Sequence, residues 1–227
     1  MLFDLFQNGF SFDLIINIGV RLLFIIFLLP VHEFAHAYVA TKLGDPTAKN
    51  MGRLTLNPLA HIDLIGSLLM LFAGFGYAKA VPVNLRNFRP EKRKRNMALI
   101  AFAGPFSNII MAMIFAFFYF LIIKTNNDYN GFAGNLSQIC VIATQCNVTL
   151  AVFNMLPIPP LDGSRILSII LPDKYYYKIM QYERYILIAV LVLIATGALD
   201  VPLSFISGII LKGIFLLYGT VFGLTLG

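Results

Sequence analysis

Long apolar segments constrain what this chain can fold into more than any other feature of its sequence. They lie at about 14–41, 62–76, 97–123, 136–158, 183–199 and 201–226. A helix needs about 20 apolar residues to cross the hydrocarbon core of a bilayer. The chain has 227 residues, 59% of them hydrophobic and 12% charged, which is outside the range of soluble globular domains. The sequence therefore predicts an all-α membrane protein with five to six transmembrane helices, forming one polytopic domain over residues 1–227.

The basic residues predict the topology. Seven of the 17 Lys and Arg lie between Lys79 and Arg95. Beside apolar segments, such a cluster favours a cytoplasmic loop near anionic lipid over a nucleic-acid partner. The linker 42–61 is basic as well, and a single crossing by the run between these linkers cannot return to the same side. We expect a re-entrant or extended segment at about 62–87, with a short tilted span as the alternative. The expected location is the cytoplasmic (inner) cell membrane, with several passes.

The first apolar run contains His32-Glu33-Phe34-Ala35-His36. Residues four apart lie on one face of a helix, about 6 Å apart along its axis. Both imidazoles can then bind one Zn²⁺ while the carboxylate of Glu33 reaches the water on that ion. Ionisable side chains inside a membrane segment are costly and indicate a function. The alternative is that neighbouring helices satisfy these polar groups without a metal.

A catalytic zinc ion needs a third protein ligand, for which Asp162 is the best candidate. It follows Pro157-Ile158-Pro159-Pro160, and so many prolines cannot continue a helix. Unwound backbone at membrane depth must face protein or water. We expect Gly163 to allow an unusual backbone angle beside Asp162. A plain turn around Asp162 is one alternative, and ligation by His61 in its place is another.

Three motifs follow one another along the chain, namely His32-Glu33-x-x-His36, Ala103-Gly104-Pro105-x-x-Asn108 and Asn154-x-x-Pro157-x-Pro159-x-Leu161-Asp162-Gly163. In this order they resemble the site-2 protease family of intramembrane zinc metalloproteases. Two further stretches, Gly44-Asp45-Pro46-Thr47-Ala48 and Gly52-Arg53-Leu54-Thr55-Leu56-Asn57-Pro58, resemble its compact bacterial and archaeal branch. The likeness runs nearly the whole length of the chain.

This resemblance implies a zinc metalloendopeptidase that hydrolyses peptide bonds in or near transmembrane segments. One Zn²⁺ per chain would be held by His32, His36 and Asp162, with Glu33 as the catalytic acid and base. Asn154 would steady the substrate or the oxyanion, and an extended segment at about 74–87 would hold a substrate strand. The implied partners are a transmembrane protein or peptide substrate and the lipid bilayer. No PDZ domain or CBS pair is expected.

Two other classes of function stay open at the level of sequence. A transporter or channel for zinc or another cation could use the same His/His/Asp cluster. Against it, the sequence has no internal repeat of the kind that transporters use, and no other acidic cluster within its apolar runs. A catalytically silent binder of transmembrane helices is a third hypothesis, and the presence of Glu33 argues against it. The sequence assigns no role to Asn108.

Overall fold

The computed structural model describes residues 19, 22, 24–64, 66–67, 79–125 and 131–224. In these ranges the chain forms helices and irregular segments without a strand. The longer elements are η1 (Phe24–Leu28), α3 (Leu29–Lys42), α4 (Thr47–Asn50), α6 (Arg93–Thr125), α7 (Phe132–Asn154), α8 (Asp162–Ile166), α9 (Asp173–Gln181), α10 (Glu183–Ala195) and α11 (Asp200–Phe222). Short 3₁₀ turns lie at η2 (Pro58–Ala60), η3 (Leu85–Asn87), η4 (Pro90–Lys92) and η5 (Leu167–Ile169). The all-α membrane protein that the sequence predicts is confirmed.

Three helices among the described residues are long and apolar enough to cross a membrane. They are Pro90–Thr125, Phe132–Asn154 and Asp200–Phe222. The predicted five to six spans include two more helical runs that are shorter here, since α3 has 14 residues and α10 has 13. Most of the run at 62–76 lies outside the described residues, so its re-entrant path stays a prediction. Residues 79–84, next to it, have no helical structure.

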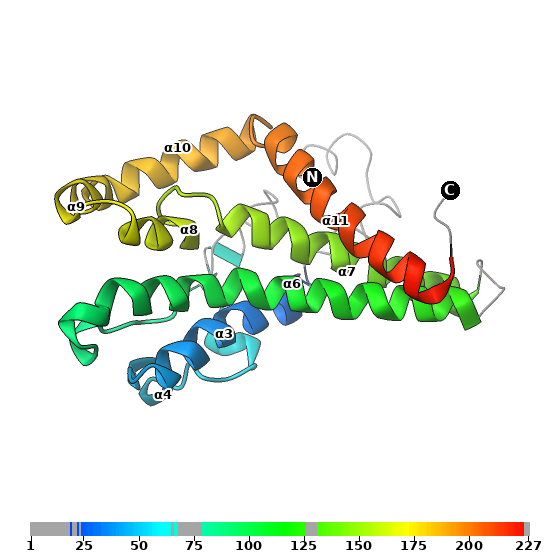
Figure 1. Cartoon of the computed structure of the whole chain (residues 1–227), viewed down its shortest axis with the longest axis horizontal. Coiled ribbons are helices and arrows are strands. Elements are labelled where there is room, and N and C mark those ends of the chain that lie inside the picture. The colour runs from blue at the N-terminus through cyan, green and yellow to red at the C-terminus, as the bar shows by residue number, and fades with distance from the viewer. Residues whose placement is uncertain are drawn as a thin grey trace.

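Helix α6 is the element against which the site is assembled (Figure 1). It packs along α7 and α3, and it also contacts α8 and α11. Small side chains on α6, Ala112 and Ala116, form a buried cluster with Val148 and Val152 of α7 and Ile214 of α11. Small residues let helix backbones approach closely, which is how helices associate in lipid. Helix α6 therefore lies between α3 on one side and α8 on another.

The end of α3 shows why the chain turns sharply after the second histidine of the motif. Gly44 has a φ of +106°, a left-handed conformation that glycine adopts without a steric penalty. The amide of Asp45 donates to the carbonyl of Ala40 (2.9 Å), and that of Gly44 donates to Thr41 (3.2 Å). These two bonds form a Schellman motif, which satisfies the last carbonyls of the helix. Asp45 is therefore part of the turn that closes this helix.

The proline-rich segment breaks the helix as predicted. Helix α7 ends at Asn154 and α8 begins at Asp162, with irregular backbone between them. The expected role of Gly163 is wrong in one respect, because Gly163 is helical and does not have a positive φ. A Cβ atom at this position would lie 2.3 Å from the carbonyl oxygen of Met155 and 2.5 Å from that of Leu156. Glycine is needed here for close packing against the end of α7.

The turn between the last two helices ends just before Asp200. It lies at 196–199, and Asp200 is already the first residue of α11. Gly197 has a φ of +72°, and the amide of Ala198 donates to Leu193 (3.0 Å). The glycine thus ends α10, while Pro202 fits within the first turn of α11, where no intrahelical donor is required.

Candidate metal centre

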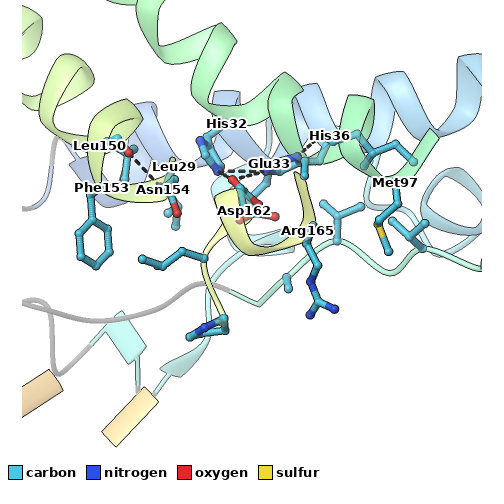
Figure 2. Close-up of a pocket in the computed structure, with 17 residues that line it drawn as sticks. Leu29, His32, Glu33, His36, Met97, Leu150, Phe153, Asn154, Asp162 and Arg165 are labelled. Carbon is cyan, nitrogen blue, oxygen red and sulfur yellow. Dashed lines mark hydrogen bonds and ion pairs between the residues drawn. The ribbon is translucent and has the colours of Figure 1, made fainter. Parts of the chain in front are cut away.

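Three side chains from two separate elements converge beside α6. His32 and His36 lie on one face of α3, and Asp162 is the first residue of α8 (Figure 2). The Nε2 atoms of both histidines lie 3.2 Å from Oδ2 of Asp162, and they lie 3.0 Å from each other. The structure therefore brings together the two residues of the first motif and the candidate from the proline-rich segment.

This donor set fits a zinc ion. Two imidazole nitrogens and one carboxylate oxygen make up a common protein complement of a catalytic zinc site, with one position left open. Ligand atoms bound tetrahedrally at about 2.0–2.1 Å are separated by roughly 3.3 Å, close to the separations seen here. Oδ2 of Asp162 is buried, and among the described residues its polar neighbours are these two histidine nitrogens. Lone pairs crowded so closely repel one another unless a cation or a proton lies between them.

The orientation of the histidine rings is set by α6. Nδ1 of His36 donates to the carbonyl oxygen of Ile100 (2.6 Å), and Nδ1 of His32 lies 3.0 Å from the side-chain amide of Asn108. Partners at Nδ1 fix the rotation of each ring and leave Nε2 facing the other ligand atoms. Metal-binding histidines commonly donate from their second ring nitrogen in this way, as His36 does to Ile100.

The rings of His32 and His36 pack against α6 at Gly104. A Cβ atom there would lie 2.3 Å from Nε2 of His36 and 2.6 Å from Cε1 of His32. Both rings therefore rest on bare helix backbone at Gly104. The absence of a side chain at Gly104 thus lets the candidate ligands pack directly against α6.

The three ligand candidates open onto a pocket of about 460 Å³ (Figure 2). Glu33 lines this pocket beside the histidines and is 7% exposed. Its carboxylate makes no hydrogen bond or ion pair to another described residue, which leaves it accessible to a water molecule. Asn154 lines the pocket too, and its Nδ2 donates to the carbonyl of Leu150 (3.1 Å), so its Oδ1 stays available.

Comparison with known proteins decides the family. The profile described as "Peptidase family M50" matches residues 122–196, which include Asn154 and Asp162. The Bacillus subtilis (strain 168) protein named "Putative zinc metalloprotease YwhC" is 46% identical over 167 residues, covering 73% of this chain and 75% of that protein. The chain belongs to peptidase family M50, the site-2 protease family.

More distant relatives of this M50 protein carry similar names. "Putative zinc metalloprotease MJ0611" of Methanocaldococcus jannaschii is 34% identical over 155 residues, or 65% of this chain and 71% of that protein. "Putative zinc metalloprotease Rip2" of Mycolicibacterium smegmatis is 27% identical over 177 residues, or 76% of this chain and 65% of that protein. No solved structure matches the chain. The resemblance read from the motifs is thus confirmed at the level of the family.

One wall of the pocket in this M50 protein is the irregular segment 79–84, which contributes Ala80, Val81 and Val83. The guanidinium of Arg53 donates to the carbonyl oxygens of Lys79 (2.7 Å) and Ala80 (3.2 Å). Arg53 is buried, with only 6% of its surface exposed. The side chain of Arg53 thus fixes the first part of the wall.

Asp45 fixes the other end of the same wall. Its carboxylate accepts hydrogen bonds from the backbone amide of Asn84 (2.7 Å) and from Nδ2 of Asn87 (2.6 Å), and also from Thr47. Burial raises the pKa of Asp45, but these hydrogen bonds outweigh burial and hold it below its ordinary value. These roles of Asp45 and Arg53 were not predicted from the sequence, although both residues lie in the stretches 44–48 and 52–58 that follow the histidines.

His61, the rival ligand, lies apart from the three converging side chains. It is fully buried, and its Nε2 donates to the carbonyl oxygen of Thr55 (2.8 Å), which closes the loop between them. The group of possible metal ligands found among the described residues consists of His32, His36 and Asp162. Ligation by His61 in place of Asp162 therefore finds no support in the described part of the chain.

Proposed function

We propose that this M50 protein is an intramembrane zinc metalloendopeptidase that cleaves peptide bonds in or near the transmembrane segments of other membrane proteins. The observation that carries the proposal is the convergence of His32, His36 and Asp162 at a pocket that also contains Glu33. Membership of a peptidase family supports it. Cation transport, the alternative, gains no support from the comparisons, since each relative named above carries the name "Putative zinc metalloprotease".

In this proposal His32, His36 and Asp162 hold one Zn²⁺ per chain. A zinc ion held there supplies a Lewis acid that polarises a carbonyl and lowers the pKa of water. Glu33 accepts the proton of the attacking water and then donates it to the amine nitrogen that leaves. Asn154 donates from its amide, or accepts with its oxygen, to steady the substrate backbone at the pocket wall.

The substrate must reach the pocket as extended chain, because a helix keeps its carbonyls in internal hydrogen bonds. The non-helical segment 79–84 lines the pocket and offers backbone groups along which a substrate strand can add. Cytoplasmic placement of the basic loops 42–61 and 77–95 gives water a route to Glu33 from the cytosol. We place the protein in the cytoplasmic membrane as a multi-pass enzyme.

The proposal is tested by cleavage of a single-span membrane substrate by the purified protein in detergent. We expect a defined peptide product that disappears when a zinc chelator strips the protein and returns when zinc is added back. Zinc content measured on the same samples should approach one ion per chain. Zinc-loaded protein that yields no product from such substrates, while conducting metal ions in liposomes, would contradict the proposal in favour of transport.

The assignment of the third ligand has its own test. Asp162→Asn replaces a charged ligand by a neutral amide, so we expect zinc affinity to fall by about 10- to 100-fold. His61→Asn is the matched control, since the amide can still donate within its loop and His61 is not in the group of convergent ligand atoms. Competition with a metal-binding dye measures both affinities. Zinc affinity that falls in the His61 variant and not in the Asp162 variant would reverse the assignment.

A further inference from the structure

Asn108 is the last residue of the second motif, and the proposed function gives it no role. It lies on α6 one turn after Gly104 and is fully buried. Its Nδ2 is 3.0 Å from Nδ1 of His32, where the amide donates to the ring nitrogen. Its Oδ1 is also buried and has no hydrogen-bond partner in the described part of the chain. A buried amide oxygen without a partner is costly and calls for an explanation.

The chemistry of zinc ligation changes what His32 requires at Nδ1. A neutral imidazole that offers the lone pair of Nε2 to a metal carries its proton on Nδ1. That N–H is buried here, so it needs an acceptor. His36 has one in the carbonyl of Ile100, at 2.6 Å. The corresponding neighbour of His32 is the side chain of Asn108.

An asparagine amide can meet both states of the ring. When Nε2 of His32 carries the proton and faces Asp162, Nδ1 accepts from the amide NH₂ of Asn108. A half-turn of the amide exchanges Nδ2 and Oδ1 with little change in the space that the side chain fills. Because Oδ1 holds no other partner among the described residues, that half-turn breaks only the bond to His32.

We propose that Asn108 is a positioning residue for the metal centre, which accepts a hydrogen bond from Nδ1–H of His32 through Oδ1 when zinc is bound. In this way Asn108 selects the tautomer of His32 whose Nε2 can ligate. The inference rests on the proposed function in so far as it takes the His/His/Asp cluster to be a zinc site. Zinc binding then requires Oδ1, the acceptor of the Asn108 amide, and does not require its NH₂ donor.

Two variants of Asn108 and one control separate the role of the amide oxygen from that of the amide NH₂ group. Asn108→Leu keeps the size of the side chain and removes both groups, so we expect zinc affinity to fall by about 10- to 100-fold. Asn108→Asp keeps only acceptors, so its affinity should stay within about threefold of the wild type or rise, as carboxylate partners make a ligating histidine more basic. Asn147→Leu is the control, because Asn147 is equally buried, has an unpartnered Oδ1 and lies on α7. Its zinc affinity should be unchanged.

The measurement is zinc affinity of the zinc-stripped proteins by chelator competition, with helix content recorded by circular dichroism as a check on folding. Should the leucine variant unfold, Asn108→Ala removes the same two polar groups without introducing the methyl groups of leucine. An aspartate variant that loses as much affinity as the leucine variant overturns the proposal, and so does a leucine variant that binds zinc normally. Failure of the proposed function is distinct, since it would appear as a wild-type protein that binds no zinc or cleaves nothing.

Discussion

Replacing Glu33 with Gln is expected to lower the rate of peptide cleavage by about 10²- to 10⁴-fold while leaving zinc bound. Glutamine has nearly the same shape as glutamate, but its amide cannot take a proton from water and return it to an amine. Glu33 lines the pocket and is absent from the group of convergent ligand atoms. The substitution should therefore remove proton transfer and leave the metal centre in place.

The experiment measures single-turnover cleavage and zinc content on the same preparations. Glu91→Gln is the matched control, because Glu91 is exposed in η4 at the start of α6, away from the pocket. We expect wild-type rates and wild-type zinc in that control. Full cleavage by the Glu33 variant would show that another group moves the proton. Loss of zinc from it would instead make Glu33 a ligand.

The core of the candidate site could be predicted because its determinants are local in sequence. The spacing of His32 and His36 puts both rings on one helix face wherever that helix packs. The prolines before Asp162 end α7 whatever surrounds them, because proline lacks the amide that a helix needs. Hydropathy identified α6, α7 and α11 for the same reason, since each is a long apolar run.

What the sequence left out depends on contacts between distant segments. The carbonyl of Ile100 that orients His36 is a backbone group, and every residue has one, so no pattern of side chains marks it. The bond from Asn84 to Asp45 joins residues 39 positions apart. Gly163 was predicted to matter for its backbone angle, but a glycine is needed there because the chain packs closely against Met155.

Gly104 is another such case, because its motif is visible in the sequence while its contact with the histidine rings depends on packing. Its replacement by alanine is expected to reduce zinc affinity by at least ~100-fold and to stop cleavage. The added Cβ would lie 2.3 Å from Nε2 of His36 and 2.6 Å from Cε1 of His32. Rings displaced by several tenths of an ångström cannot keep metal–ligand distances that tolerate only about 0.2 Å.

This loss should occur without loss of the helix, which makes the experiment decisive. Alanine favours a helix interior over glycine by roughly 1 kcal/mol, so α6 itself gains from the change. Gly208→Ala on α11 is the matched control, because a Cβ there meets nothing within 4 Å. Zinc affinity and helix content measured on both variants separate a blocked site from a misfolded protein. If the Gly104 variant binds zinc as tightly as the Gly208 variant, the histidines do not ligate from where they rest on α6.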